Sequence, residues 1–181
     1  MGEYLAYADA EPVRLLVVGG SALAASGVSS RVTYDLDVFA RRGPVDGEIV
    51  DARPLPEDLL EAAQKVADEL KLREDWLNAN VSLFALSFSD YPSDFFSELT
   101  EQIYGSHLSI TYLGRTGLIY LKFHAAIDPG RQRRAIDLED LQKLKPTESE
   151  SRRSLDWLRS CELLTPANEA EMESLLNALQ S

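Results

Sequence analysis

The stretch that decides the fold is residues 15–40, LLVVGGSALAASGVSSRVTYDLDVFA. The apolar run 13–18 ends at Gly19 and Gly20, a pattern that predicts a buried strand stopped by a tight turn. The residues that follow are good helix formers, and Ser21 stands where a helix-capping residue is preferred. We therefore expect a strand, a glycine turn and a short helix in direct succession.

Two aspartates separated by one leucine lie near the end of this stretch. Residues 32–38 alternate apolar and polar side chains, which predicts a second strand. Side chains two positions apart on a strand point to the same face, about 6.6 Å apart, so we expect Asp35 and Asp37 to project together, with Thr33 on their face. Carboxylates at this separation suit one or two divalent cations such as Mg²⁺ (or Mn²⁺), and paired metals clamp the attacking and leaving oxygens of a displacement at phosphorus.

The glycine turn supplies a matching phosphate site. Gly19 and Gly20 have no side chains, so the backbone can approach a phosphate closely. The helix that follows presents unpaired N–H groups and the positive end of its dipole, and the Ser21 hydroxyl adds a donor. The sequence therefore predicts a phosphate site and a metal site on adjacent pieces of the chain.

The rest of the chain reads as strands mixed with helices, followed by helices alone. This order predicts an α+β fold with a small mixed β-sheet packed by helices over residues 1–115, and a helical C-terminal subdomain over residues 116–181 that packs on this core as a single compact unit. The further strands are expected over residues 48–52 and 107–114, and the further helices over residues 56–72, 93–104, 116–127, 132–144, 147–164 and from 165 onward.

A lysine and two aspartates lie where apolar residues are expected. At 100° per residue, Lys122 falls near the middle of the apolar stripe of its helix, and Asp137 and Asp140 fall on the buried side of the next helix. Such charges must be paired or face a cleft, because an isolated buried charge is very costly. Two compatible interpretations stay open: an ion pair that fixes the two helices, or a nucleotide site in which Lys122 binds the triphosphate.

These residues resemble the nucleotidyltransferase superfamily of polymerase-beta-like fold. Its pattern is an apolar residue, Gly, Gly or Ser, a spacer, and Asp-x-Asp or Asp-x-Glu between apolar residues, which the chain matches at residues 18–21 and 35–38. The extended form GGSALAASG...RVTYDLDV is similar to the minimal, toxin-related branch that includes AbiEii-type toxins and their uncharacterised bacterial relatives. That branch also carries a later block, which LIYLKFHAAIDPGRQRRAIDLEDLQKL matches at Lys122, Arg134, Asp137 and Asp140.

The resemblance implies an enzyme that transfers a nucleoside monophosphate from an NTP to a hydroxyl group. The acceptor is expected to be a tRNA end, a protein side chain or a small molecule, and the setting a toxin–antitoxin or phage-defence pair with a cognate antitoxin. The implied roles are Mg²⁺ (or Mn²⁺) on Asp35 and Asp37, catalysis by these two with Asp137 and Asp140, and nucleotide binding by Gly19, Gly20, Ser21, Arg31, Thr33 and Lys122.

One departure from the family pattern concerns a third carboxylate. Polymerase-beta-like enzymes usually place one on a later core strand, whereas VSLFALSF and LSITYL contain none. Asp51 is one candidate, and Asp137 or Asp140 is another by analogy with the toxin branch, while Asn78 is assigned a structural role. The alternatives to an enzyme are a catalytically inactive nucleotide-binding or partner-binding protein of the same fold, and ion pairs that serve structure only.

Composition limits the partners. The formal net charge of −12 argues against broad nucleic-acid binding, which needs clustered basic residues, although a local pair such as Arg41 and Arg42 leaves a tRNA end open as an acceptor. The apolar runs are too short to span a bilayer and the acidic N-terminus has no signal-peptide pattern, so we expect a cytoplasmic protein. Cys161, His107 and His124 do not have the spacing of zinc ligands.

Overall fold

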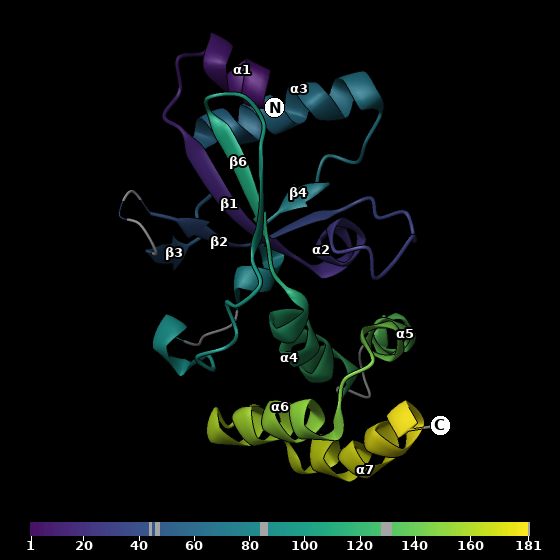
Figure 1. Ribbon diagram of the computed structural model, residues 1–181. Coiled ribbons are helices and arrows are strands. Elements are labelled where there is room, and N and C mark those ends of the chain that lie inside the picture. Colours follow the sequence, from purple (N-terminus) through teal and green to yellow (C-terminus); the bar gives the residue numbers. More distant parts are fainter. Residues whose placement is uncertain (44, 46–47, 84–86, 128–131, 181) are drawn as a thin grey trace. The chain divides into compact units, whose positions relative to one another are not determined.

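Strand β1 (Val13–Val18) lies at the centre of a mixed sheet (Figure 1). The strand order is β3-β2-β1-β6-β5, and β4 pairs with β2 beside this path. The β1–β6 and β2–β4 pairs are parallel, and the others are antiparallel. The α+β class predicted from the sequence is confirmed. The remaining strands are β2 (Leu36–Arg42), β3 (Ile49–Asp51), β4 (Leu77–Asn78), β5 (Thr100–Ile103) and β6 (Leu108–Tyr112).

The computed structural model describes residues 1–43, 45, 48–83, 87–127 and 132–180. Contacts within the chain divide it into two units, and each is described by itself. The first consists of Met1–Ala85 and Leu99–Leu113, and the second of Leu86–Glu98 and Gly114–Ser181. No helix in the described part of the chain is long and apolar enough to cross a membrane.

One face of the sheet in the first unit packs against helices α1 (Gly2–Tyr7) and α3 (Glu57–Leu70). Alternate residues of β1 point to this face, and Leu15 is fully buried there with Leu59 of α3. Burying a leucine side chain contributes roughly 1.5–3 kcal/mol. Helix α2 (Gly19–Ala25) lies against β1, β2 and β6. The predicted order of strand and helix is therefore confirmed, but α2 begins directly at Gly19 without a separate turn. We use the name glycine turn for Gly19 and Gly20, the first two residues of α2.

A β-bulge sets the register between β1 and β2. Midway along β1 the register shifts by one residue, so that Phe39 is an extra residue in β2. Val18 consequently pairs with Asp37, whereas in the register of the preceding pairs it would lie opposite Val38. Since neighbouring residues of a strand point to opposite faces, this shift decides which side chain lies beside the end of β1.

The second predicted strand begins later than expected. The alternation predicted a strand over residues 32–38, but β2 begins at Leu36, because the ladder with β4 starts at the pair of Leu36 and Leu77. Val32 and Tyr34 are 68% and 69% exposed instead of contributing to the core.

Two helix predictions are wrong. Ser21 is not a helix cap: α2 already begins at Gly19, and the Ser21 hydroxyl donates to the carbonyl oxygen of Val18 at 3.1 Å. The helix predicted over residues 93–104 is absent from this described segment, because Thr100–Ile103 pairs with β6 as strand β5. Pairing with a neighbouring strand here overrides the local pattern.

Helix α4 (Arg115–Ala126) is central to the second unit. It lies against α5 (Arg134–Leu144) and α6 (Glu148–Ser160), and α5 lies against α7 (Pro166–Gln180). These helices agree with the four predicted C-terminal helices to within a few residues at their ends.

Aromatic side chains hold residues 87–98 in the second unit. The ring centroids of Tyr91 and Trp157 are 5.7 Å apart, and Tyr120 packs edge-on against Trp157 at 5.4 Å. The sequence analysis counted this segment in a core of residues 1–115. Its packing on α4 and α6 explains why it groups with the C-terminal helices.

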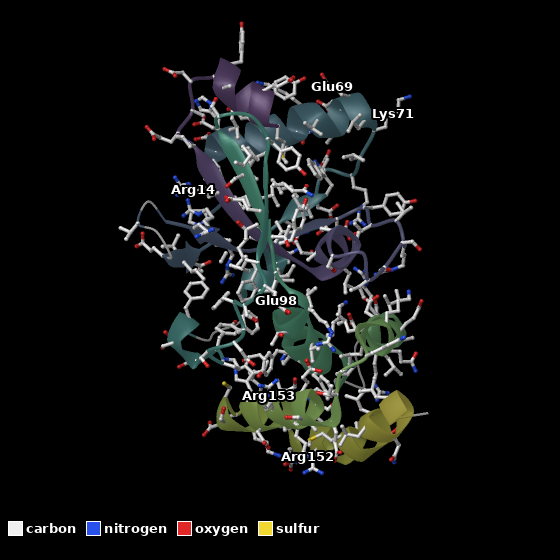
Figure 2. The ribbon with its side chains drawn as sticks, in the orientation of Figure 1. Arg14, Glu69, Lys71, Glu98, Arg152 and Arg153 are labelled. Atoms are coloured by element: carbon white, nitrogen blue, oxygen red, sulfur yellow. The ribbon has the colours of Figure 1, made fainter. Side chains whose placement is uncertain are left out.

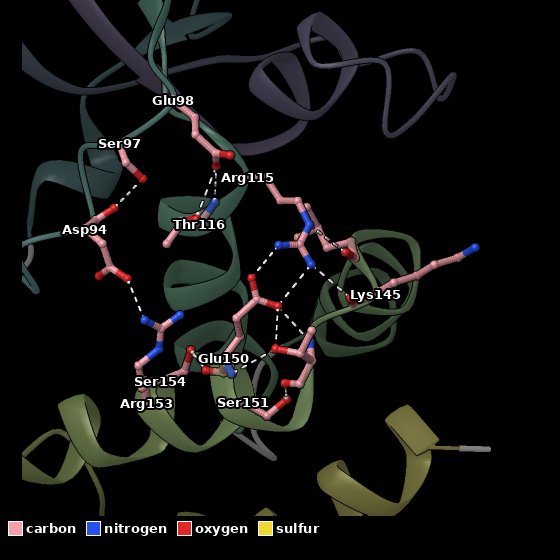
Figure 3. Close-up of polar contacts among 12 residues, drawn as sticks. Asp94, Ser97, Glu98, Arg115, Thr116, Lys145, Glu150, Ser151, Arg153 and Ser154 are labelled. Carbon is pink, nitrogen blue, oxygen red and sulfur yellow. Dashed lines mark hydrogen bonds and ion pairs between the residues drawn. The ribbon is translucent and has the colours of Figure 1, made fainter.

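Arg115 ties the start of α4 to the end of α5 and to the cap of α6 (Figure 3). Its guanidinium donates to the terminal carbonyl oxygens of Leu144 and Lys145 at 3.1 and 2.9 Å, and to Glu150 Oε1 at 2.5 Å. Glu150 also accepts a bond from the backbone N–H of Thr147 at 2.7 Å, which completes a capping box. The hydrogen bond from Arg115 is the largest cause that lowers the pKa of Glu150 to about 2.

We expect Glu150→Gln to lower the free energy of unfolding at pH 7 by about 1–2 kcal/mol, since solvent at the exposed edge of Arg115 screens part of the interaction. Because the pKa of Glu150 is lowered from 4.5 to about 2 by folding, this stabilisation is present above the unfolded value and is lost as the pH falls towards 2. Urea denaturation should therefore show the gap between wild type and variant closing between pH 5 and pH 2.

The control is Glu148→Gln, which removes an exposed pair with Arg152 on the same helix. Figure 2 labels Arg152. This change should cost less than about 0.5 kcal/mol. Equal losses in the two variants would contradict the role given to Arg115 and Glu150.

Candidate functional site

The glycine turn lies directly against Asp37. Gly19 has a φ of +71°, and a Cβ at this position would lie 2.5 Å from Asp37 Oδ2. Any other residue would be strained in this conformation and would displace the carboxylate. A glycine at position 19 is therefore required both by the backbone conformation and by the space beside Asp37.

The second glycine faces Thr33 and Arg31. A Cβ at Gly20 would lie 3.0 Å from Thr33 Oγ1 and 3.6 Å from Arg31 Nη2. The Thr33 hydroxyl donates to the carbonyl oxygen of Asp35 at 3.2 Å. The structure therefore brings Gly19 and Gly20 together with Arg31, Thr33 and Asp37 in the first unit, five positions that the family resemblance assigns to one site.

Asp35 immediately precedes β2 and lies outside the strand. Arg31, Thr33 and Asp35 are half-buried, whereas the two residues between them are exposed. That Asp35 and Asp37 project together stays a prediction. The negative charge of Asp35 also contributes to raising the pKa of Arg73, after the larger effect of the Asp75 carboxylate.

The strand beside Asp37 carries an amide. Asn78 pairs with Asp37 in the β2–β4 register, and its Nδ2 donates to Asp37 Oδ1 at 3.3 Å. The sequence analysis gave Asn78 a structural role and so missed this contact. In the sequence DWLN, the polar Asn78 directly follows two apolar residues, and this was the only local sign of a site residue. The local pattern does not predict that β4, a strand of two residues, pairs with β2.

Asp51, one of the residues considered for the third carboxylate, lies elsewhere on the sheet. It pairs with Ala40 in the β2–β3 register, is exposed, and accepts a hydrogen bond from the backbone N–H of Arg53 at 2.9 Å. Asp137 and Asp140, the other candidates, belong to the second unit.

The carboxylates of Asp35 and Asp37 suit a hard divalent cation. Mg²⁺ is usually bound by one or two protein carboxylates together with substrate phosphates and water. The missing side chain of Gly19 leaves the Oδ2 atom of Asp37 facing the turn that is predicted to receive a phosphate. Among the described residues there is no group of three or more His, Cys, Asp or Glu side chains that could hold a metal ion. That Asp35 and Asp37 hold a cation together with a nucleotide stays a prediction.

Lys122, Asp137 and Asp140 form a buried charged triad between α4 and α5. Lys122 Nζ lies 2.7 Å from Asp137 Oδ1 and 2.7 Å from Asp140 Oδ2, and the three side chains are 11%, 6% and 1% exposed. The predicted ion pair between the two helices is confirmed, and it includes both aspartates. That Lys122 binds a triphosphate, and that Asp137 or Asp140 takes part in catalysis, stay predictions.

Arg134 belongs to the same sequence block and caps the C-terminal end of α4. Its Nε donates to the carbonyl oxygen of Ala126 at 2.8 Å, and its Nη2 lies 2.6 Å from a carboxylate oxygen of Glu171. A cation at the C-terminal end of a helix is favourable, because the last carbonyl oxygens have no partner within the helix.

Comparison of the chain with protein families, with curated proteins and with solved structures finds no match. We therefore infer the function from the residues of the site. Within the first unit, that site consists of the Gly19–Gly20 turn, the segment that contains Arg31, Thr33 and Asp35, and the Asp37–Asn78 pair.

We expect Gly19→Ala to lower the free energy of unfolding by more than Gly27→Ala does. Both glycines have a φ of +71°, so both variants bear the cost of a left-handed conformation, about 1–2 kcal/mol. Only at Gly19 would the new methyl group meet the Asp37 carboxylate, since no described atom lies within 4 Å of a Cβ at Gly27. Urea denaturation measures the difference, and equal losses would contradict the close approach.

We expect Lys122→Met to lower the free energy of unfolding by about 3–5 kcal/mol, because it leaves two buried carboxylates without their cation. Lys143→Met is the matched control, since Lys143 pairs with Glu139 at the surface of α5. The control should cost no more than about 0.5 kcal/mol. If Lys122→Met also lowers the free energy of unfolding by no more than about 0.5 kcal/mol, the triad does not stabilise the second unit.

Proposed function

We propose that this chain is a Mg²⁺-dependent nucleotidyltransferase that transfers a nucleoside monophosphate from an NTP to a hydroxyl group. The observation that carries the proposal is the contact of the glycine turn with Asp37, at the point where that turn also faces Thr33 and Arg31. Phosphate-binding backbone, two carboxylates and a cationic side chain are the groups that an NTP with its metal requires.

Asp35 and Asp37 would hold Mg²⁺, which when bound neutralises phosphate charge and stabilises the attacking and leaving oxygens. Gly19 and Gly20 begin α2, where their backbone N–H groups would donate to phosphate oxygens. The Arg31 guanidinium lies beside Gly20, where it can donate hydrogen bonds to phosphate oxygens.

In the proposed reaction the oxygen of the acceptor hydroxyl forms a bond to the α-phosphorus. The bond from that phosphorus to the bridging oxygen of the β-phosphate breaks, pyrophosphate leaves, and the hydroxyl proton passes to a base. By family resemblance the acceptor is a tRNA end, a protein side chain or a small molecule, and the protein acts as the toxin of a toxin–antitoxin or phage-defence pair.

One observation favours a second candidate function. The strand beside Asp37 presents Asn78, an amide, where an acid would add a metal ligand or a base. A catalytically inactive relative that binds nucleotide or a protein partner would retain the turn and the two carboxylates without turnover.

We expect an NTP with Mg²⁺ to raise the melting temperature of the protein, and the double variant Asp35→Asn with Asp37→Asn to lose this rise. At 100 times the dissociation constant the stabilisation is about 2.7 kcal/mol, well within the range of thermal denaturation. Asp51→Asn is the matched control, because Asp51 is an exposed carboxylate on the neighbouring strand. No rise with any of the NTPs would overturn the proposal.

Release of pyrophosphate separates the two candidate functions. The enzyme releases it in the presence of its acceptor, and Asp35→Asn should reduce the rate by about three orders of magnitude or more, since metal stabilisation contributes several kcal/mol to the transition state. Metal-dependent nucleotide binding without any release, across candidate tRNA, protein and small-molecule acceptors, would support the inactive relative.

A further inference from the structure

We infer that Asn78 is a positioning residue that fixes the orientation of the Asp37 carboxylate for metal binding. This inference rests on the proposed function, because it concerns how the metal site is held. Its basis is the geometry of the three residues Asp37, Asn78 and Gly19 in the first unit.

The two oxygens of Asp37 face different groups. Oδ1 accepts a hydrogen bond from Asn78 Nδ2 at 3.3 Å, and Oδ2 faces the backbone of the glycine turn, 2.5 Å from where a Cβ of Gly19 would be. The bond from Asn78 supports the arrangement in which Oδ2 is directed at the turn.

The amide of Asn78 is itself held in one orientation. Its Oδ1 accepts a hydrogen bond from the backbone N–H of Asn80 at 3.0 Å, so that the NH₂ group must point the other way. The NH₂ group also lies 3.5 Å from the carbonyl oxygen of Asp75. An N–H of the backbone thus fixes the amide, and the amide fixes the carboxylate.

Strand β4 holds Asn78 in place independently of this side chain. The backbone N–H of Leu36 donates to the carbonyl oxygen of Trp76 at 2.5 Å, and the Trp76 indole N–H donates to the carbonyl oxygen of Ala63 in α3 at 3.1 Å. Because β4 is fixed by its backbone and by Trp76, replacing the Asn78 side chain should leave the strand in position. The effect of such a change can therefore be read at the metal site.

The side chain of Asn78 is uncharged, and this affects how Asp37 would bind a metal ion. An amide donor orients Asp37 without competing for the cation, whereas an aspartate at position 78 would direct a second carboxylate oxygen at Asp37 Oδ1. In the absence of metal those two oxygens repel each other. In its presence the added carboxylate becomes a further ligand of the kind that hard cations prefer.

The experiment is a titration of the purified full chain with Mn²⁺, in which the electron paramagnetic resonance signal reports the free ion. Asn78→Ala should weaken Mn²⁺ binding by about 10-fold, the low end of the effect of losing a group that orients a metal ligand. Asn80→Ala is the matched control and should bind like wild type, because only the backbone N–H of Asn80 is used. Asp37→Asn should abolish binding.

A second variant excludes a purely structural role. Asn78→Asp should melt at a lower temperature than wild type without metal, and Mn²⁺ should raise its melting temperature by more than it raises that of wild type. A structural role for Asn78 predicts a loss that Mn²⁺ does not recover, and this result would overturn the inference.

The outcomes separate this inference from the proposed function. If wild type binds Mn²⁺ and Asp37→Asn does not, while Asn78→Ala binds like wild type, the metal site stands and the inference about Asn78 is wrong. If wild type binds Mn²⁺ neither alone nor with a non-hydrolysable NTP, the metal site of the proposed function fails, and the inference fails with it.

Discussion

The pairing of β1 with β2 is the constraint on which the candidate site depends. The bulge at Phe39 shifts the register by one residue, and the shift places Asp37 opposite Val18, the last residue before the glycine turn. Without it a valine would take that place and the carboxylate would point to the other face. A bulge next to a site is a common way in which a sheet redirects one side chain. The left-handed conformation of Gly19 then brings the turn itself against that carboxylate.

The two units use charged groups in different ways. In the second unit Arg115 and Glu150 join three helices through bonds that satisfy the ends of α5 and α6, and Lys122 is held between two buried aspartates. Buried charges survive only when they are paired in this manner. In the first unit Arg31, Thr33 and Asp37 lie beside Gly19 and Gly20, which have no side chains of their own.

The sequence predicts the local features of the site well and its tertiary contacts less well. The apolar run before Gly19, the α+β class and the burial of Lys122, Asp137 and Asp140 follow from periodicity, which depends on each segment alone. The start of β2, the conversion of residues 100–103 into a strand and the contact of Asn78 with Asp37 depend on which strands pair. Strand pairing joins residues far apart in the chain, so a local pattern does not contain it. The third carboxylate could not be chosen among Asp51, Asp137 and Asp140 from the sequence, because that choice also depends on contacts between distant residues.

The central claim is that Asp35 and Asp37 hold a divalent cation against the phosphates of a nucleotide at the glycine turn. The most direct measurement is a crystal structure of the protein with Mn²⁺ and a non-hydrolysable NTP, with anomalous diffraction to locate the metal. We expect an anomalous peak for a metal ion that is bound by both carboxylates and by a phosphate oxygen, with the phosphates against Gly19 and Gly20. A nucleotide bound elsewhere, or a metal that contacts neither aspartate, would contradict it.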